Sequence, residues 1–273
     1  MSTWFVTGAS SGLGRAIAEH VLATGHQVMA TARSTSSIED LRSAQPSTAL
    51  TATLDVTDRG SITAAVAAAE ARFGGIDVLV NNAGYGYTAA VEEGEDDDVA
   101  RLFATNLFGP VELIKAVLPG MRARGTGTIV NVSSIGARIT IPGGGYYSAS
   151  KAALEGVSGS LRQEVEPLGL HVVVVEPGSF RTDFRGRSAD QSARRIDAYD
   201  DVLGRTGDQR LGPQHGDPAK AAVAILQAVE HSEPPRLLVL GTDAVGGRRA
   251  AADEEAREVT RFAHLSRSTD ADS

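Results

Sequence analysis

The chain has 273 residues, of which 42% are hydrophobic and 22% charged, with a formal net charge of −8 and no cysteine. This length and apolar content suit one sizeable globular domain or two small ones. The lack of cysteine excludes disulfides and thiolate metal sites, and the acidic balance argues against a broad surface for nucleic acid or anionic membrane.

Short apolar segments alternate with helical patterns along most of the chain. The segments typical of buried strands are residues 4–7, 27–32, 50–56, 76–81, 128–133, 171–177 and 236–241. Helical patterns cover 14–25, 36–44, 61–74, 98–123, 147–169 and 218–231. Strands this apolar, joined by helical crossovers, predict an α/β fold: a single doubly wound domain of the Rossmann type, with a seven-stranded, mainly parallel sheet and helices on both faces.

No linker divides the chain, so we expect one domain over residues 1–241, with the polar segment 183–217 inserted and helping to bind substrate. Residues 242–273 have the composition of a charged helix with a frayed tail. The first residues lead directly into a strand rather than a signal peptide, and no apolar run is long enough to span a bilayer. We therefore expect a cytoplasmic protein.

A glycine-rich turn joins the first strand to the first helix. Gly8, Gly12 and Gly14 in VTGASSGLG have the spacing GxxxGxG. The first glycine permits a tight turn, the second lets the backbone approach a pyrophosphate, and the third lets helix and strand pack closely. The pyrophosphate would lie at the helix N-terminus, where unpaired N–H groups favour an anion. Against the alternative of an ordinary β–α turn, this position predicts a dinucleotide site made of Gly8, Ser10, Ser11, Gly12, Leu13 and Gly14.

The end of the second strand indicates which dinucleotide is bound. An acidic residue there favours the ribose 2′-hydroxyl of NAD, whereas an arginine accommodates the 2′-phosphate of NADP. Ala32 occupies the acidic position and Arg33 follows it, with Arg15 placed just after the glycine turn. We expect NADP(H) as the preferred cofactor and NAD(H) as the alternative, unless Arg33 is an ordinary solvated loop residue.

Residues 143–151 read GGGYYSASK and place two tyrosines shortly before a lysine. In a helix over 147–166, Tyr147 and Lys151 are four residues apart and share one face, whereas Tyr146 points elsewhere. A nearby ammonium group stabilises a phenolate and lowers the pKa of the phenol, toward the range of a general acid or base. Helix geometry therefore selects Tyr147 as the catalytic group and leaves Tyr146 as a packing residue.

Six short motifs occur in a fixed order along the chain: TGASSGLG at 7–14, NNAG at 81–84, the asparagine of FATNLFG at 106, two serines at 133–134, YSASK at 147–151 and PGSFRT at 177–182. Their order and spacing, from about residue 3 to 241, resemble the short-chain dehydrogenase/reductase family. The resemblance is closest to its 17β-hydroxysteroid-dehydrogenase-like and bacterial ketoreductase branch. It implies an oxidoreductase that transfers hydride between nicotinamide and a carbonyl or secondary alcohol.

The resemblance also implies residue roles. Tyr147 would donate a proton to the carbonyl oxygen, and Lys151 would lower the pKa of Tyr147 and bind the nicotinamide ribose. Ser134, rather than its structural neighbour Ser133, would orient the substrate oxygen, and Asn106 would hold a water that links Lys151 to solvent. The implied cofactor contacts are Asp55 and Val56 at the adenine, Asn82, Ala83 and Gly84 along the cleft, Tyr147 and Lys151 at the ribose, and Pro177, Gly178, Phe180 and Thr182 at the carboxamide. Structural alternatives exist for Asp55 as a strand end, Asn82 as a turn residue, and Asn106 and Ser134 as buried polar groups.

The residues after the fourth, fifth and sixth strands favour a medium-sized, partly apolar carbonyl or alcohol substrate. The candidate pocket residues are Tyr85, Tyr87, Val91, Ile135, Arg138, Gly143 to Gly145, Phe180, Phe184, Tyr199 and Leu203. Five arginines of the inserted region, Arg181, Arg185, Arg187, Arg194 and Arg195, either bind an acidic substrate group or form a solvated face, and the second interpretation is favoured.

No metal is expected, because the acidic run 92–98 suits a helix N-terminus and the histidines have no ligand spacing. The intact serine, tyrosine and lysine favour an enzyme over a non-catalytic NADP(H)-binding sensor or scaffold on the same fold. An epimerase or dehydratase is a weaker alternative. In relatives, helices corresponding to 98–123 and 147–168 form the subunit interface, so we expect a homodimer or homotetramer that acts on a small molecule, without nucleic-acid or membrane partners.

Overall fold

The computed structural model describes residues 1–182, 184, 188–205 and 214–271. Within these residues the main sheet has seven strands in the order β3-β2-β1-β4-β6-β7-β9, and every neighbouring pair is parallel. The predicted fold class is confirmed, and the sheet is wholly rather than mainly parallel. Its strands are β1 (Thr3–Val6), β2 (Gln27–Ala32), β3 (Ala49–Thr53), β4 (Val78–Asn81), β6 (Gly127–Val132), β7 (Leu170–Pro177) and β9 (Leu237–Leu240).

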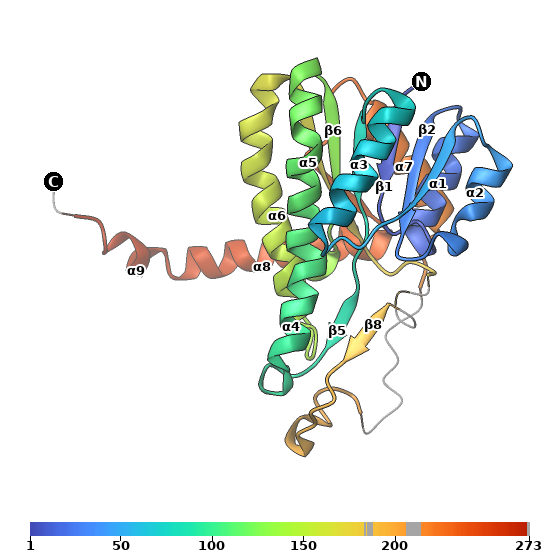
Figure 1. Ribbon diagram of the computed structural model, residues 1–273. Helices are drawn as coiled ribbons and strands as arrows, with labels where there is room; N and C mark the ends of the chain where they lie inside the picture. The colour runs from blue at the N-terminus through green and yellow to red at the C-terminus, as the bar shows by residue number, and fades with distance from the viewer. Residues whose placement is uncertain (183, 185–187, 206–213, 272–273) are drawn as a thin grey trace.

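Side chains along the strands alternate between two buried layers. On β1, Trp4 and Val6 enter one layer and Phe5 enters the other. Because both faces of the sheet are covered, both must be apolar, and the strands therefore appear in the sequence as near-continuous apolar runs. The first layer is covered by α1 (Gly12–Ala23), α2 (Glu39–Ala44) and α7 (Pro218–Glu230), and the second by α3 (Arg59–Phe73), α5 (Gly109–Arg124) and α6 (Gly145–Val165) (Figure 1).

A long helical stretch, predicted at 98–123, consists of α4 (Asp96–Phe103), a π-helical segment (Ala104–Phe108) and α5. Three aspartates in the first turn of α4 suit the positive end of the helix dipole, as the acidic run predicted. This stretch is long and apolar enough to cross a membrane, a property that buried core helices of soluble proteins share. Here Leu113 and Val117 are buried against the sheet, which accounts for the apolar composition.

The inserted segment contains a strand that the sequence analysis missed. β8 (Ala189–Gln191) pairs in parallel with β5 (Gly86–Thr88) and forms a small sheet apart from the main one (Figure 1). The segment is anchored by Glu93, a fully buried carboxylate. Glu93 binds the Arg205 guanidinium at 2.7 and 2.8 Å and accepts the Ile196 N–H at 2.8 Å. Three-residue strands carry too little periodicity to be recognised in a sequence, so only the tertiary structure shows this sheet.

The C-terminal extension is helical, with α8 (Thr242–Arg261) followed by α9 (Ala263–Arg267). The start of α8 packs on the domain, where Asp243 accepts a 2.8 Å hydrogen bond from the Ser179 N–H. Further along, α8 and α9 project away from the body of the domain (Figure 1). The domain boundary at residue 241 stays a prediction.

Candidate active site

The predicted site segments meet at the carboxyl ends of the strands. β1 and β4 are adjacent in the sheet, yet the chain runs from β1 to β2 and β3 on one side and from β4 to β6, β7 and β9 on the other. Ligands of open α/β sheets bind in the crevice at such a switch point. The glycine turn follows β1 and the NNAG motif follows β4, so the two motifs flank this crevice.

The glycine turn has a backbone that requires glycine. Gly8 and Gly12 have φ values of +67° and +57°, in the left-handed region that other residues rarely adopt. At Gly14 a Cβ atom would lie 2.3 Å from Asn82 Nδ2 and 2.4 Å from the Gly8 carbonyl oxygen, so the close packing of helix and strand needs glycine there too. α1 begins in this turn without an acidic residue in its first turn, which leaves its N-terminus suited to a pyrophosphate. The other predicted members, Ser10, Ser11 and Leu13, lie in the same turn.

The segment after β4 supports the glycine turn. Asn82 Nδ2 donates hydrogen bonds to the carbonyl oxygens of Thr7 and Gly8, at 2.9 and 3.2 Å. In return, Thr7 Oγ1 accepts the N–H groups of Asn82 and Ala83, at 3.0 and 2.9 Å. Asn82 therefore shapes the crevice by holding the turn, and its side-chain amide is already used for that purpose.

Arg33 and Asp55 lie near each other at the ends of β2 and β3. The Arg33 side chain is exposed and makes no hydrogen bond or ion pair with another described residue. Asp55 accepts the Thr57 hydroxyl and N–H at 2.7 and 2.9 Å, and these bonds, with the charge of Arg33, hold the pKa of Asp55 below its usual value. An unpaired guanidinium beside this crevice is available for a phosphate, while buried Val56 backs the loop from inside.

Arg15, the second arginine near the turn, is already engaged. Its guanidinium forms ion pairs with Glu19, at 2.7 Å, and with Asp40. Arg15 would have to exchange these partners to bind a phosphate, so Arg33 is the arginine that the structure leaves available.

Four predicted catalytic residues come together from three parts of the chain. Tyr147 and Lys151 lie in the first two turns of α6, Ser134 is the second residue after β6, and Asn106 lies in the π-helical segment. The Tyr147 hydroxyl is hydrogen-bonded to Ser134. Ser134 Oγ also accepts the Gly136 N–H at 3.0 Å, which fixes its direction. A phenol and a hydroxyl held together in this way can bind the same substrate oxygen.

Burial dominates the electrostatics of Tyr147 and Lys151. It raises the pKa of Tyr147 to about 12, opposed by the hydrogen bond to Ser134. It lowers the pKa of Lys151 to about 8, opposed by the carboxylate of Glu155. Lys151 Nζ donates at 2.9 Å to the Val132 carbonyl oxygen. The expected lowering of the Tyr147 pKa by Lys151 is therefore not found in this structure, because desolvation is the larger effect and the ammonium is bound to a backbone carbonyl.

Asn106 is fully buried, and its side chain is satisfied by protein groups. Nδ2 donates to the Tyr85 carbonyl at 2.9 Å and to Ser150 Oγ at 3.1 Å, and Oδ1 accepts the Tyr85 N–H at 3.1 Å. A Cβ on Gly84 would lie 2.9 Å from Oδ1, so only glycine fits there. Pro110, four residues on, has no N–H to donate to the Asn106 backbone carbonyl. A water held by Asn106 would therefore bind this carbonyl rather than the side chain.

The segment after β7 faces the glycine turn. The Thr182 side chain lies 3.4 Å from the position that a Cβ on Gly12 would take. Phe180 forms a β-bridge with Gly216 and packs on the α1 layer. The predicted residues Pro177, Gly178, Phe180 and Thr182 thus lie on the wall of the crevice opposite α1.

The neighbours of the two catalytic candidates point away from the site. The Tyr146 hydroxyl donates to the Val91 carbonyl at 2.6 Å, and Ser133 Oγ donates to Glu155 at 2.6 Å in a buried position. Both side chains have structural partners, which agrees with the sequence-based choice of Tyr147 and Ser134.

An apolar wall borders Tyr147 on the substrate side. The rings of Tyr147 and Phe184 have centroids 5.8 Å apart. Leu203 of the inserted segment reaches over Gly143, where a Cβ would lie 2.9 Å from its Cδ2 atom. Phe184 of the inserted segment therefore lies next to Tyr147, and Leu203 of the same segment lies next to Gly143.

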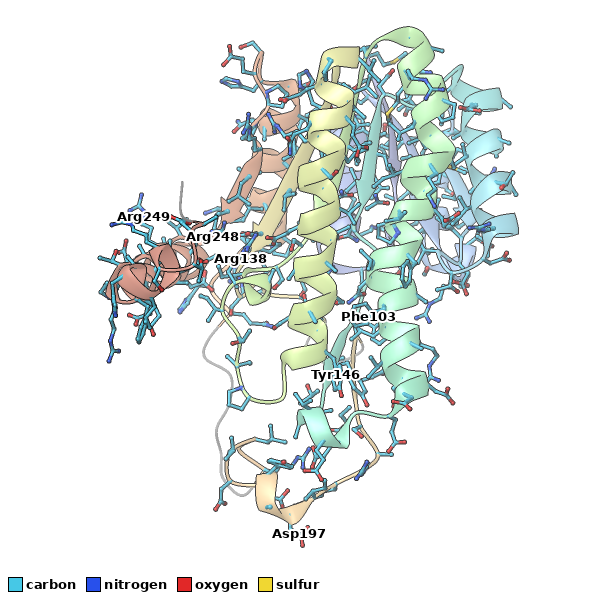
Figure 2. All side chains as sticks on the ribbon, turned by 90° about the vertical axis from the view of Figure 1, so that its left-hand side faces the viewer. Phe103, Arg138, Tyr146, Asp197, Arg248 and Arg249 are labelled. Carbon is cyan, nitrogen blue, oxygen red and sulfur yellow. The ribbon has the colours of Figure 1, made fainter. Side chains whose placement is uncertain are left out.

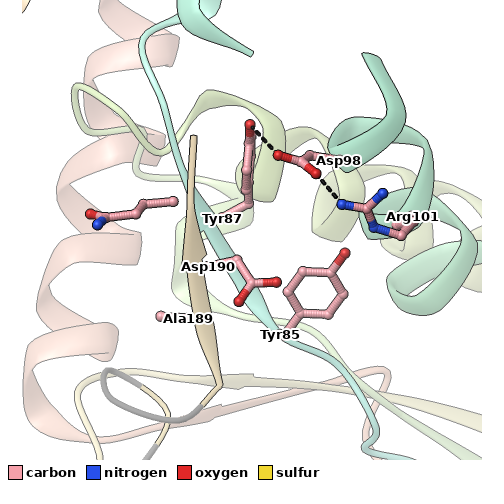
Figure 3. Close-up of a pocket in the computed structure, with 7 residues that line it drawn as sticks. Tyr85, Tyr87, Asp98, Arg101, Ala189 and Asp190 are labelled. Carbon is pink, nitrogen blue, oxygen red and sulfur yellow. Dashed lines mark hydrogen bonds and ion pairs between the residues drawn. The ribbon is translucent and has the colours of Figure 1, made fainter. Parts of the chain in front are cut away.

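Tyr85 and Tyr87, predicted in the substrate pocket, face a different hollow (Figure 3). Side chains alternate along a strand, so Gly86 faces Phe184 while the two tyrosines face the opposite side. The two tyrosines therefore line this hollow on the side of β5 away from Phe184, and their place in the substrate pocket stays a prediction. Their hollow has a volume of about 380 Å³ and is lined by Tyr85, Tyr87, Asp98, Arg101, Ala189, Asp190 and Gln191.

The charged residues of the insert mostly pair with one another. Arg181 lies 3.6 Å from Asp217, and Arg195 Nε donates to Asp200 at 3.0 Å. Arg194 is exposed, whereas Arg185 and Arg187 lie outside the described residues. In the part of the chain that the structure describes, no three histidine or acidic side chains are close enough to hold a metal ion.

The sequence analysis missed two buried glutamates beside the site, Glu155 and Glu176. Glu155 follows Lys151 by one helical turn, and Glu176 ends the apolar run of β7. Charged residues are rarely buried without a partner, so a glutamate in such a run was a signal that could have been used.

A family model described as short chain dehydrogenase matches residues 2–193. An oxidoreductase named BOA17 from Botryotinia fuckeliana is 40% identical over 94% of this chain and 97% of its own length. A 3-ketodihydrosphingosine reductase from Bacteroides thetaiotaomicron is 38% identical over 84% of each chain.

Solved structures are similar over nearly the full length. A short-chain dehydrogenase from Streptomyces avermitilis has 45% identity and a TM-score of 0.93, covering 99% of this chain and 100% of that one. A short-chain dehydrogenase from Burkholderia cenocepacia, in complex with NADP, has 26% identity and a TM-score of 0.75, covering 96% and 97%. The extension formed by α8 and α9 thus falls within the length shared with the Streptomyces structure.

Proposed function

Because the chain belongs to the short-chain dehydrogenase/reductase family of NAD(P)-dependent oxidoreductases, we propose that Tyr147 is the general acid and base of a hydride transfer between NADP(H) and a carbonyl or secondary alcohol. The observation that carries this proposal is the hydrogen bond between Tyr147 and Ser134 beside buried Lys151. The three groups stand at the end of the crevice that begins at the glycine turn.

The residues of the crevice fit a phosphorylated dinucleotide. The left-handed glycines and the start of α1 suit the pyrophosphate, and Arg33 suits a 2′-phosphate. Ala32 leaves no carboxylate at the strand end, and Asp55 is occupied by Thr57. We therefore propose a preference for NADP(H) over NAD(H), which agrees with three solved relatives that were crystallised with NADP.

In this mechanism the bound nicotinamide supplies or accepts the hydride. Ser134 and Tyr147 bind the substrate oxygen, and Tyr147 gives it a proton during reduction or removes one during oxidation. Lys151 binds the ribose and, in its charged form, stabilises the phenolate that remains. The Asn106 carbonyl holds a water through which the proton of Tyr147 is replaced.

The substrate is proposed to be a medium-sized, partly apolar carbonyl compound or alcohol. Phe184 packs beside Tyr147, and we propose that Leu203, which lies over Gly143, extends this apolar side of the pocket. The similarity to a 3-ketodihydrosphingosine reductase adds 3-ketodihydrosphingosine to the substrate panel. Arg181 and Arg195 are paired with aspartates, so an acidic substrate group is not favoured.

The test follows nicotinamide absorbance while purified protein is mixed with NADPH or NADH and a panel of ketones, aldehydes, quinones and steroid ketones. Consumption of NADPH that is lost in Tyr147→Phe supports the proposal. NADPH consumption that persists in Tyr147→Phe would show that Tyr147 is not the general acid. Tight NADPH binding without turnover, in this panel and in the reverse reaction with alcohols, would favour a dinucleotide sensor.

We also propose a homodimer or homotetramer in a cytoplasmic setting. Phe108 and Val157, at the start of α5 and on α6, are exposed, and Cβ atoms on Gly156 and Gly159 would meet nothing within 4 Å. A second copy of the chain would cover these surfaces. Light scattering on the purified protein gives the mass directly, and a monomer at all concentrations would contradict this proposal.

A further inference from the structure

A buried cluster of charges lies behind Lys151, and the mechanism above does not use it. Glu155 of α6 and Glu176 at the end of β7 are 8% and 0% exposed. Arg138, which follows Ser134 by one turn, and Arg248 of α8 approach them from the surface (Figure 2). The cluster therefore joins α6, β7, α8 and the loop after β6 at one point.

Each carboxylate oxygen of Glu155 has a donor. Its Oε1 accepts the Ser133 hydroxyl at 2.6 Å, and its Oε2 pairs with Arg138 Nη2 at 2.6 Å. A buried carboxylate with two charge-assisted or hydroxyl donors is stabilised in its ionised form. Ser133 and Arg138 therefore hold both oxygens of the Glu155 carboxylate in place.

Glu176 is held differently. Its Oε1 accepts a hydrogen bond from Arg248 Nη1 at 2.7 Å and lies 4.0 Å from Arg138 Nε. Its Oε2 accepts no hydrogen bond from any of the described residues. When Glu176 is protonated, its carboxyl group can donate a hydrogen bond, and the neighbouring acceptor is the carboxylate of Glu155. Burial and the charge of Glu155 raise the pKa of Glu176 to about 7, against the effect of Arg248. Burial and the neighbouring carboxylate thus both favour the protonated form of Glu176.

This charge acts on Lys151. Glu155 and Lys151 are four residues apart on α6, which places their Cβ atoms about 5–6 Å apart on one helix face. Lys151 is buried with a neutral carbonyl as its hydrogen-bond acceptor, and a buried ammonium needs an opposite charge to remain ionised. The other titratable groups around it are Tyr147 on the same helix, Glu176 on β7, Arg138 in the loop after β6, and Arg248 on α8.

We propose that Glu155 is a positioning residue that keeps Lys151 in its charged form, with Ser133 and Arg138 holding its carboxylate in place. Glu155 touches neither substrate nor cofactor and acts only through Lys151. This inference rests on the proposed function, in which a charged Lys151 binds the ribose and stabilises the phenolate. It also gives the buried charges of the cluster a task that packing alone does not require.

The test reads the protonation of Lys151 directly and does not depend on turnover. The chain has three lysines, Lys115, Lys151 and Lys220, so the side-chain carbons of ¹³C-labelled lysine give three NMR signals. Lys115→Arg and Lys220→Arg, both at exposed positions, assign the signals. In the wild-type protein we expect the Lys151 signal to titrate near pH 8.

Glu155→Gln should move the Lys151 titration down by about one pH unit or more, since an opposite charge at this range shifts a pKa by that amount. Glu164→Gln is the matched control, because it removes the same charge from an exposed position of the same helix and should leave the titration unchanged. Glu155→Asp keeps the charge and should restore most of the wild-type value.

The proposal is overturned if the titration midpoint of Lys151 shifts no more in Glu155→Gln than it does in Glu164→Gln. If Glu155→Gln does not fold, the double variant Glu155→Gln/Arg138→Gln removes the carboxylate together with its surface partner. The same downward shift of the Lys151 titration is then expected, and its absence overturns the proposal. Failure of the proposed function is distinguishable, because an inactive protein would still show the titration of Lys151 and its response to Glu155.

Discussion

The hydroxyl of Tyr147, in the first turn of α6, is hydrogen-bonded to Ser134, the second residue after β6. The bond opposes the effect of burial on the Tyr147 pKa, and the Gly136 N–H fixes the direction of Ser134 from the other side. The two oxygens are therefore placed together before any substrate arrives, which is the arrangement that proton transfer to a carbonyl requires.

Ser134→Ala removes this bond and one of the two groups that bind the substrate oxygen. We expect kcat/KM for ketone reduction to fall by about 100-fold or more, the range typical of a positioned proton-transfer partner. Steady-state kinetics at saturating NADPH measures it. Ser160→Ala, on the exposed face of α6, is the control, and an equal loss in both variants would contradict the role of Ser134.

Arg33→Ala removes the unpaired guanidinium at the end of β2. We expect the Kd for NADPH to rise by about 10- to 100-fold, because one charge-assisted contact to phosphate is lost, while the Kd for NADH stays unchanged. Quenching of protein fluorescence, or calorimetry, measures both constants. Arg257→Ala on α8 removes the same charge far from the crevice. A parallel rise for both cofactors would show that Arg33 does not read the 2′-phosphate.

Glu93→Gln weakens the anchor of the inserted segment. The Arg205 guanidinium holds the pKa of Glu93 at about 2, so the pair is ionised at every working pH. Without the charge, we expect faster tryptic cleavage in the segment 192–205 and a higher KM for apolar substrates, because Leu203 is released from the pocket. The neighbouring Glu92→Gln, which loses an exposed bond to Tyr199, is the control. Equal cleavage of wild type and Glu93→Gln would contradict the anchor.

Glu176 gives a pH dependence of stability with a definite sign. Its pKa is raised from 4.5 to about 7 in the folded protein, so the native state binds more protons than the unfolded state between these values. Its contribution to stability is full below pH 4.5 and is lost as the pH rises through 7. Glu176→Gln should therefore reduce the fall in unfolding free energy between pH 5 and 7.5 by about 1–3 kcal/mol.

Urea unfolding of wild type and Glu176→Gln at the two pH values measures this difference, and other titrating groups cancel in the comparison. Glu166→Gln, at an exposed position paired with Arg162, is the control. Curves for wild type and Glu176→Gln that fall in parallel would show that Glu176 is ionised in the folded protein at pH 5.

The fold was predictable because its signals are local and repeated. Every strand of the main sheet is an apolar run that a helical pattern follows or precedes, and both layers of the sheet demand such runs. The glycines of the turn and the choice of Tyr147 over Tyr146 also depend on short-range geometry, on φ angles and on the turn of one helix. The roles of the catalytic and cofactor residues stay predictions that the experiments above address.

Contacts between distant segments decided the rest. The short strand β8 has a structure only because β5 offers it an edge, and the pairing of β5 turned Tyr85 and Tyr87 away from Tyr147. Glu155 and Glu176 are 21 residues apart in the sequence, and the charge of Glu155 raises the pKa of Glu176 only because α6 packs over β7. Periodicity and motif spacing thus determined the sheet, the glycine turn and the catalytic candidates. The directions in which the pKa values of Tyr147 and Lys151 shift depend mainly on burial, which only the packed tertiary structure decides.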